Sequence, residues 1–448
     1  MKREISDELL KWKDQKNRKP LLLEGMRQCG KTYILKEFGE QNFKNTVYFN
    51  FEDTPEIGDI FQSDLNPKRI IEQLAVKSRT KIEPGNTLII FDEIQFCNRA
   101  LTSLKYFCEN ASEYHIACAG SLLGIMLSKP YSFPVGKVDR LKMGPMNFKE
   151  FLLANSEEYL VEFIDRTDPT EWLSESVVND LKTYLDYYFI VGGMPAAVSA
   201  WVNDKDIQMV DAELEKIVAD YMDDFSKHAS DSILNLTLIW DSIPVQLGKE
   251  NQKFMFGHAK TGARAKDLEN ELQWLINAGL VHKVKKVDPP QIPLPMNVNT
   301  TSFKIYMADI GILRKVANIS SDFIFGRDKE YDSYRWIATE NYVLNELISA
   351  MNDTPYYWRS NNDAEVDFIA QVGMAVIPIE VKAGRSQSKS LSEYRKRYSP
   401  EAAVMISMKS GRDGALNNIP LYAVWRIEDH IQNVVKGESR QVRSSLQR

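Results

Sequence analysis

GMRQCGKT, residues 25–32, fits the pattern G-x-x-x-x-G-K-[ST] of a phosphate-binding loop. An apolar run at residues 21–23 precedes the loop, and a helix-like stretch from Tyr33 to Phe38 follows it. In this context the loop N–H groups and the helix N-terminus face a bound anion. Lys31 offers a charge to the outer phosphates and Thr32 a hydroxyl to magnesium, whereas a plain glycine-rich turn is the alternative. We therefore predict a nucleoside triphosphate site made by Gly25, Met26, Arg27, Gln28, Cys29, Gly30, Lys31, Thr32 and Tyr33.

The composition is typical of a soluble globular protein with two to four domains. Of the 448 residues, 44% are hydrophobic and 26% are charged. No apolar stretch is long enough to span a bilayer, and residues 1–4 lead into a charged helix instead of a signal peptide. The four cysteines include no C-x-x-C pair, which indicates neither zinc nor a disulfide framework. We expect a cytoplasmic protein without a membrane partner, in which any nucleic-acid contact needs a local basic patch because the net charge is −6.

Two strand-like runs follow the loop, at residues 46–51 and 87–91, and the second continues into Asp92-Glu93. A near-continuous apolar run is typical of a strand buried on both faces of a parallel sheet. Carboxylates at its C-terminal end emerge where ligands bind to such sheets. We predict that Asp92 holds magnesium and that Glu93 is the general base for the attacking water. The alternative is a solvated strand end, which the preceding phosphate loop makes the weaker interpretation.

A further strand, residues 115–119, ends in Gly120-Ser121. In ATPases with a strand inserted between the phosphate-loop strand and the catalytic strand, the inserted strand carries a polar sensor of the γ-phosphate. Ser121 occupies that place, although an ordinary turn serine is the alternative. Right-handed crossovers then give a three-layer αβα sheet. Arg140 or Lys137 could reach the γ-phosphate of a neighbouring subunit, or could be plain surface charges.

The middle of the chain reads as helical from about residue 155 to residue 230. The stretch Gly192-Gly193-Met194-Pro195 interrupts this pattern. A Gly-x-Pro turn in a helical lid could cover the adenine through Pro195, or could be only a loop. Residues 235–285 read as a winged-helix unit, for which we favour interdomain packing over nucleic-acid contact because two glutamates share a helix with its basic residues. Residues 289–295 are proline-rich and read as a linker.

The C-terminal part combines a helix at residues 336–347 with two strands, residues 364–370 and 376–382. Period-two alternation places Glu380 and Lys382 on one strand face, and Asp367 lies across the hairpin. This is the D…E-x-K arrangement of metal-dependent nucleases, in which two carboxylates hold a divalent cation and the lysine positions a water. An inert charged strand is the alternative. We predict catalytic roles for Asp367, Glu380 and Lys382, and Mg²⁺ or Mn²⁺ ligation by Glu340, Asp367 and Glu380.

The order of these motifs resembles prokaryotic ATP-binding proteins with an AAA-type N-terminal domain and a C-terminal PD-(D/E)xK nuclease-like domain of unknown function. Residues 146–151, residues 304–313 and Glu340-Asn341 share in the resemblance. It implies ATPase activity with adenine as the base, and a lid turn at residues 193–195 similar to that of signalling ATPases with numerous domains. Related sequences tend to have Gly-Arg where this chain has Gly136-Lys137, and lysine lacks the bidentate fork of arginine. The implied ATP site is Gly25, Gly30, Lys31, Thr32, Asp92 and Glu93 with Ser121 as sensor, and the implied nuclease-like set is Glu340, Asp367, Glu380 and Lys382.

We therefore expect an α/β protein of five parts. An N-terminal three-layer αβα P-loop domain of the AAA (ASCE) type spans 1–154, followed by a helical lid at 155–232 and a winged-helix-like domain at 233–290. A linker at 291–320 leads to an α/β restriction-endonuclease-like domain at 321–448.

Two functional hypotheses follow. In the first, the chain hydrolyses ATP with Mg²⁺ and couples this to nucleic-acid binding or to metal-dependent cleavage of DNA or RNA. In the second, ATP drives a switch or ring assembly, and the nuclease-like domain is inert and only binds a nucleic-acid or protein partner. A regulatory or chaperone-like ATPase without a nucleic-acid partner is a third, weaker interpretation. A homo-oligomer is expected because AAA-type sites are often completed between subunits.

Overall fold

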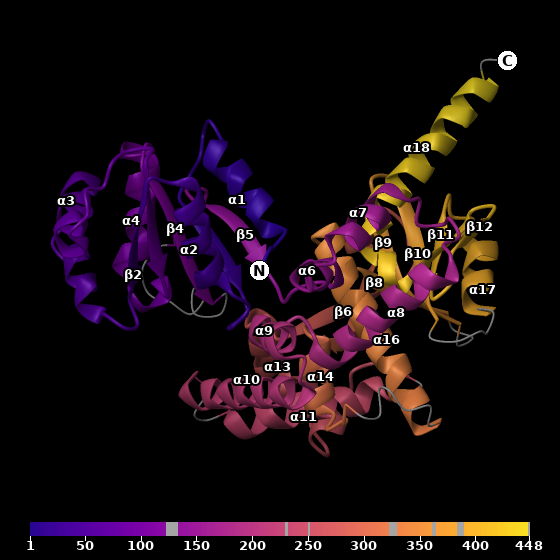
Figure 1. The fold of residues 1–448 in the computed structure, drawn as a ribbon. Helices are drawn as coiled ribbons and strands as arrows, with labels where there is room; N and C mark the ends of the chain where they lie inside the picture. The colour runs from indigo at the N-terminus through magenta and orange to yellow at the C-terminus, as the bar shows by residue number, and fades with distance from the viewer. Residues whose placement is uncertain are drawn as a thin grey trace. The chain divides into compact units, whose positions relative to one another are not determined.

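The computed structural model describes residues 1–121, 133–228, 232–249, 251–321, 329–360, 364–382 and 389–446. These residues form two compact units (Figure 1). Unit 1 consists of Met1–Gly144 with Asn277–Gly279, and unit 2 consists of Pro145–Ile276 with Leu280–Arg448. Among the helices of the described ranges, none combines the length and apolarity needed to cross a bilayer.

Unit 1 is built on a parallel sheet of five strands in the order β2-β3-β4-β1-β5. β4 lies between β3 and β1, as the sequence predicts, and β3 is buried along its whole length. The strands are β1 (Leu21–Gly25), β2 (Asn45–Asn50), β3 (Thr87–Asp92), β4 (His115–Ser121) and β5 (Asp139–Met143).

Helices cover both faces of this sheet, because successive residues of a strand point to opposite faces and the buried strands are apolar on both. Ile89 and Phe91 of β3 belong to a core cluster with residues of α3 and α4. Leu88, on the opposite face of β3, lies against Gly39 of α2. The helical elements are α1 (Ile5–Asp14), α2 (Lys31–Asn42), η1 (Pro55–Phe61), α3 (Pro67–Ser78), η2 (Ile94–Phe96) and α4 (Asn98–Asn110).

Unit 2 begins with helices, and the stretch predicted to be helical, residues 155–230, is confirmed as such over its described part. α6 starts with a capping box, in which Asn147 and Glu150 satisfy each other's backbone N–H groups. The helices up to β6 are α6 (Phe148–Ala154), α7 (Glu158–Arg166), α8 (Glu175–Val191), α9 (Pro195–Asp204), α10 (Ile207–His228), α11 (Ile233–Leu247), α12 (Phe256–Ala259) and α13 (Ala265–Asn277).

An eight-stranded mixed sheet lies in unit 2, in the order β12-β13-β11-β10-β9-β8-β6-β7. The predicted hairpin is confirmed: β9 and β10 are antiparallel, and Gly373 turns between them with φ of 61°. The strands are β6 (Val281–Val287), β7 (Val298–Met307), β8 (Tyr356–Arg359), β9 (Glu365–Val372), β10 (Ala375–Val381), β11 (Ala403–Ser407), β12 (Gly411–Asp413) and β13 (Leu416–Pro420). The remaining helices are η3 (Leu294–Asn297), α14 (Ile310–Val316), α16 (Lys329–Met351), α17 (Lys389–Tyr398), η4 (Leu421–Arg426) and α18 (Ile427–Leu446).

Two boundaries differ from the sequence-based expectation. The segment 291–320 was expected to be a linker, but it contains η3, β7 and α14, and β7 pairs with β6. The prolines mark only the connection between these two strands. The second difference is α6, which falls in unit 2 although we expected the N-terminal domain to reach residue 154. Its Phe148 packs edge-on against Tyr188 and Tyr342, so the helix shares the unit 2 core.

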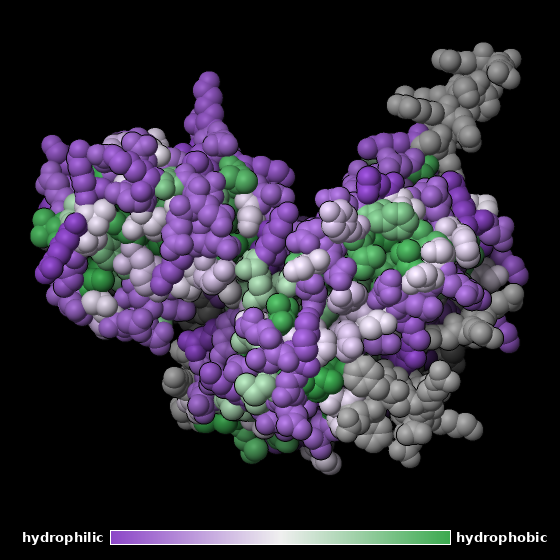
Figure 2. All heavy atoms as spheres, viewed as in Figure 1, coloured by the Kyte–Doolittle hydropathy of each residue, from purple (hydrophilic) through white to green (hydrophobic). Residues whose placement is uncertain are grey.

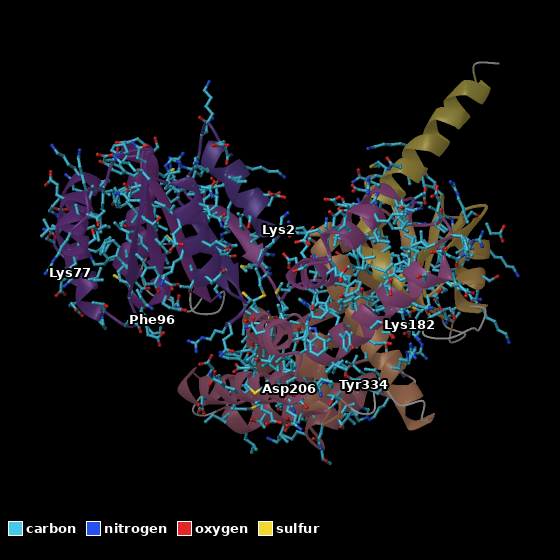
Figure 3. All side chains as sticks on the ribbon, viewed as in Figure 1. Lys2, Lys77, Phe96, Lys182, Asp206 and Tyr334 are labelled. Carbon is cyan, nitrogen blue, oxygen red and sulfur yellow. The ribbon has the colours of Figure 1, made fainter. Side chains whose placement is uncertain are left out.

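Polar side chains dominate the visible faces of both units (Figure 2). A few apolar side chains are nevertheless exposed, among them Phe96 of η2, which lies just after the acidic pair in the sequence (Figure 3). Single exposed apolar residues of this kind are ordinary and need no functional explanation.

A packing prediction concerns Gly193, in the turn between α8 and α9. A Cβ atom there would lie 2.0 Å from the carbonyl oxygen of Met146, which is backbone and cannot rotate away. Gly193→Ala should therefore destabilise unit 2 by about 1–3 kcal/mol. Gly144→Ala is the matched control, since nothing lies within 4 Å of its added methyl group. Differential scanning calorimetry should show a lower melting temperature for Gly193→Ala alone, and equal melting temperatures would contradict the packing described.

Candidate nucleotide-binding site

The loop between β1 and α2 has a backbone shape that glycine makes possible. Gly30 adopts φ of 96° and ψ of 19°, in the left-handed region, directly before the first residue of α2. Gly25 lies so close to β5 that a Cβ atom would stand 2.1 Å from the carbonyl oxygen of Met143. The first turn of α2 leaves backbone N–H groups without helical partners at the end of this loop. Such N–H groups and the helix dipole favour an anion.

Lys31 folds back over the loop that precedes it. Its Nζ donates hydrogen bonds to the carbonyl oxygens of Gly25, at 3.0 Å, and Met26, at 2.7 Å. The Lys31 side chain is buried, and both of these hydrogen bonds go to backbone carbonyl oxygens. The ammonium can therefore exchange a carbonyl oxygen for a phosphate oxygen without breaking an ion pair.

Asp92, the last residue of β3, joins the catalytic strand to the phosphate loop. Its Oδ2 accepts a hydrogen bond from Thr32 Oγ1 at 2.8 Å. Its Oδ1 accepts one from the backbone N–H of Glu93 at 3.1 Å. Asp92 is 3% exposed, and these donors satisfy carboxylate oxygens that water does not reach. The structure thus brings Lys31, Thr32 and Asp92 into one site.

Glu93 takes a left-handed backbone conformation, with φ of 49° and ψ of 44°. This turn directs the chain from β3 into η2, where Gln95 Nε2 donates a hydrogen bond to the Glu93 carboxylate. Burial raises the pKa of Glu93, and the charge of Asp92 raises it further, while Gln95, Lys31 and Arg27 act in the opposite direction. A carboxylate whose pKa is raised takes a proton from water more readily.

Sequence reasoning missed Tyr48, which lies on β2. Its hydroxyl donates a hydrogen bond of 2.7 Å to Oδ2 of Asp92, the oxygen that also accepts from Thr32. The ammonium of Lys36 stands 3.6 Å from the centre of the Tyr48 ring. Burial and the neighbouring Asp92 charge raise the pKa of Tyr48, so the hydroxyl keeps its proton as a donor. The alternation along β2, together with the neighbouring position of β3, was the available signal.

Arg3 is a second residue that the sequence did not indicate. Its guanidinium donates to the carbonyl oxygens of Cys29, at 3.0 Å, and Gly144, at 2.8 Å. Cys29 in turn points its Sγ to the Met143 carbonyl oxygen at 3.4 Å. The phosphate loop is therefore held against the end of β5 from two sides.

Other residues predicted to act at this site are Tyr33, Ser121, Pro195, Lys137 and Arg140. Tyr33 is 57% exposed, and its hydroxyl donates to Glu37 at 3.2 Å. Ser121 pairs through its backbone with Gly25, but its side chain lies outside the described residues. Pro195 starts α9 in unit 2, and its contact with adenine stays a prediction. Of the candidates for a residue acting in a neighbouring subunit, Lys137 pairs with Glu109 at 2.9 Å, and Arg140 Nε lies 3.6 Å from Glu24 Oε1.

The residues present fit a triphosphate with a divalent ion. An anion would meet the helix N-terminus and Lys31. An oxygen-preferring ion would meet the hydroxyl of Thr32 and the carboxylate of Asp92, which already lie within hydrogen-bond distance of each other.

A family model described as an AAA domain matches residues 17–152. Unit 1 therefore resembles an AAA-type ATP-binding domain. Two models described as domains of unknown function, DUF8612 and DUF4143, match residues 182–322 and 337–424.

Similar solved structures include three at low identity. The Walker-type ATPase PABY2304 of Pyrococcus abyssi is 14% identical, with a TM-score of 0.45, covering 71% of this chain and 96% of that one. The ORC1 protein of Aeropyrum pernix in complex with DNA is 14% identical, with a TM-score of 0.26 and coverages of 70% and 90%. AMPPCP-bound DnaA from Aquifex aeolicus is 12% identical, with a TM-score of 0.27 and coverages of 61% and 86%. At these TM-scores we infer no function from them. No curated protein matches the sequence.

The predicted nuclease-like residues lie together in unit 2. Asp367 on β9 faces β10, where its Oδ2 accepts a hydrogen bond of 2.7 Å from the backbone N–H of Val381. Lys382 Nζ stands 2.8 Å from Oε1 of Glu380. Burial raises the pKa of Asp367 well above its ordinary value, and the charges of Glu380 and Glu340 raise it further.

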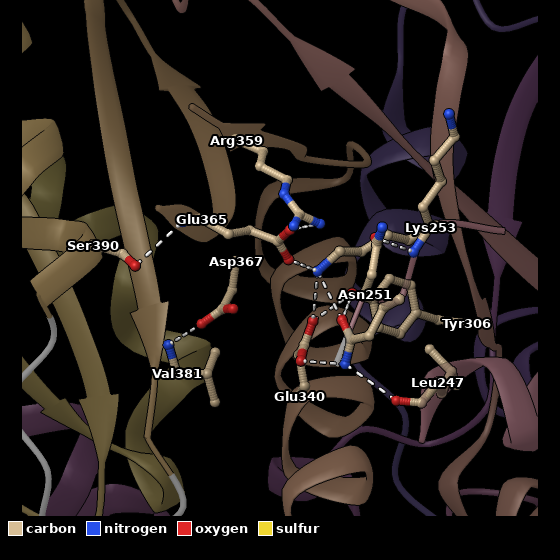
Figure 4. A network of polar contacts seen from close by, with 12 residues as sticks. Leu247, Asn251, Lys253, Tyr306, Glu340, Arg359, Glu365, Asp367, Val381 and Ser390 are labelled. Carbon is tan, nitrogen blue, oxygen red and sulfur yellow. Dashed lines mark hydrogen bonds and ion pairs between the residues drawn. The ribbon is translucent and has the colours of Figure 1, made fainter. Parts of the chain in front are cut away.

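Glu340 on α16 lies in a network that the sequence did not indicate (Figure 4). Its Oε1 accepts from the Tyr306 hydroxyl at 2.5 Å and lies 3.3 Å from Lys304 Nζ. Its Oε2 accepts from Gln252 Nε2 at 2.9 Å. Lys304 also pairs with Glu365 Oε1 at 2.5 Å. A lysine between phenylalanine and isoleucine in a buried strand was the only signal of this network.

Lys31→Ala should abolish ATP binding, because it removes the positive charge that meets the outer phosphates. Isothermal titration calorimetry with Mg-ATP measures the affinity. Lys44→Ala is the control, since Lys44 pairs with Glu83 at the surface of the same unit. Retention of wild-type affinity by Lys31→Ala would remove this lysine from the site.

Tyr48→Phe should weaken Mg²⁺ binding at the site without preventing nucleotide binding. Loss of a donor to the charged Asp92 should raise the Mg²⁺ concentration for half-maximal hydrolysis by about tenfold. The measurement is a Mg²⁺ titration of ATPase rate at saturating ATP, compared with nucleotide affinity in EDTA. Unchanged Mg²⁺ dependence would show that the hydroxyl does not position Asp92.

Proposed function

We propose that unit 1 hydrolyses ATP with Mg²⁺. Lys31 binds the outer phosphates, Thr32 and Asp92 hold the ion, and Glu93 accepts the proton of the attacking water. The ion, when bound, neutralises charge that develops on the phosphates. The observation that carries the proposal is the hydrogen bond of 2.8 Å between Thr32 and Asp92, which links the phosphate loop to the catalytic strand.

The environment of Glu93 supports its role as the general base. Its carboxylate accepts a hydrogen bond from Gln95, which fixes its direction, and lies in a partly buried setting that raises its pKa. Because a base acts only when deprotonated, hydrolysis should fall as the pH drops through this raised pKa. We propose Ser121 as the γ-phosphate sensor and Pro195 as the adenine cover, and both proposals rest on the sequence pattern. Assembly into a homo-oligomer belongs to the same proposal, since AAA-type sites are often completed by a neighbour.

The output of hydrolysis is proposed to be a switch in unit 2 that alters binding of a nucleic-acid or protein partner. A second candidate output is metal-dependent cleavage of DNA or RNA. One observation favours this second candidate: Asp367 and Glu380 lie on the adjacent strands β9 and β10, and Lys382 directly follows β10, in the D…E-x-K order. Cleavage of either nucleic acid by the wild-type chain, in Mg²⁺ or Mn²⁺ and with or without ATP, would establish the second output.

Glu93→Gln should bind ATP normally but hydrolyse it about 10²–10⁴-fold more slowly, because glutamine cannot accept the proton. Single-turnover hydrolysis and calorimetry on the same preparation separate chemistry from binding. Glu113→Gln serves as the control, since Glu113 is an exposed glutamate of the same unit. Wild-type turnover in Glu93→Gln would assign the base to another residue and leave the Lys31 result unaffected.

A further inference from the structure

A lysine ammonium lies among the carboxylates of the nuclease-like site. Lys304 comes from β7, and its side chain is 1% exposed. Its Nζ lies 2.5 Å from Glu365 of β9 and 3.3 Å from Glu340 of α16. It also donates to Gln252 Oε1 at 2.7 Å. A lysine this deeply buried is retained as a cation only where carboxylates compensate its loss of water.

Each carboxylate of the cluster already accepts from a donor of this chain. Glu340 accepts from Tyr306 and Gln252 besides Lys304, so both of its oxygens are engaged. Glu365 pairs with Arg359 at 3.6 Å as well as with Lys304.

The same holds for the two strand carboxylates. The backbone N–H of Val381 donates to Asp367, and Lys382 donates to Glu380. In the whole cluster four carboxylates therefore face three cationic side chains.

This arrangement does not fit a divalent ion. Mg²⁺ requires a near-octahedral set of oxygen ligands, whereas the oxygens of Glu340 are committed to an ammonium, a phenol and an amide. A divalent ion beside Lys304 would also be repelled by a charge that burial leaves poorly screened. Within the described ranges, no group of three or more His, Cys, Asp and Glu side chains is arranged to hold a metal ion.

We infer that Lys304 is the permanent cation of this cluster, beside the carboxylates that the D…E-x-K pattern predicts to hold a metal. The site then binds neither Mg²⁺ nor Mn²⁺ and does not cleave phosphodiesters. Its role is to tie β7 to α16 and β9 through buried charges. The inference rests on the proposed function only in that it selects the switch over cleavage as the output of ATP hydrolysis.

The first test counts Mn²⁺ ions bound to the nucleotide-free chain, by electron paramagnetic resonance of free Mn²⁺. Wild type and Glu380→Gln should bind equal numbers at millimolar Mn²⁺, and the wild type should leave plasmid DNA and RNA intact. A Mn²⁺ ion bound by the wild type and lost in Glu380→Gln would overturn the inference, as would cleavage that Glu380→Gln abolishes.

The second test removes the internal cation. Lys304→Met should gain one Mn²⁺ site, at least tenfold tighter than any in the wild type, and adding Glu380→Gln should remove it. Lys285→Met is the control, since Lys285 is an exposed lysine of the adjoining strand. If circular dichroism shows that Lys304→Met does not fold, the double variant Lys304→Met with Glu340→Gln is used instead. This double variant removes both charges of the buried pair. Failure of the folded variant to gain a Mn²⁺ site would show that Lys304 is not what excludes the ion.

Both tests omit nucleotide, so they are independent of the ATPase proposal. If the wild-type chain hydrolyses ATP and also binds a metal ion at this site in unit 2, only the inference about Lys304 would be overturned. If the wild-type chain hydrolyses no ATP, this result would overturn only the proposed function of unit 1.

Discussion

The hydrogen bond between Thr32 and Asp92 is the contact on which the proposed ATP site depends. It connects the first turn of α2 to the end of β3, and β4 separates β3 from β1, the strand that precedes α2. A phosphate loop without this contact would still attract an anion, but it would have no carboxylate beside the metal. Tyr48 adds a second donor to the same oxygen, so three elements of unit 1, α2, β2 and β3, determine the orientation of Asp92. Hydrolysis chemistry needs such fixed geometry more than it needs additional binding energy.

The parts of this site that could be predicted are those written in short, continuous stretches of sequence. The glycines at positions 25 and 30 and the lysine that follows are one such stretch, because backbone shape and chemistry coincide there. Asp92 could be found because an apolar strand ended in carboxylates. Tyr48 and Arg3 could not be found in this way, since each acts on a residue more than 25 positions away in the sequence. Their roles depend on the order of strands in the sheet and on how the N-terminal segment packs.

Unit 2 shows the same limit more clearly. The β9–β10 hairpin and its three polar side chains followed from alternation and a glycine turn. The setting of these side chains did not, because it is made by Lys304 and Gln252 from segments read as a linker and as a winged helix. The proline-rich stretch 289–295 indicates a loop, but the strand that follows it, β7, is the element that carries Lys304. Burial of a lysine among glutamates is a tertiary property, and a single lysine in an apolar strand does not show which residues surround it.

The passage from β5 into α6 has a mechanical consequence. β5 ends at Met143 and the cap of α6 is Asn147, so three residues, 144–146, connect these two elements, and the boundary between the units falls between Gly144 and Pro145. At about 3.3–3.6 Å per residue this stretch provides a reach of roughly 10 Å. Met146 is already bonded through its N–H to the Gly193 carbonyl oxygen, which shortens the free length further. A displacement of the β5 end that exceeds this length would act through the chain and the Met146–Gly193 hydrogen bond on the turn between α8 and α9.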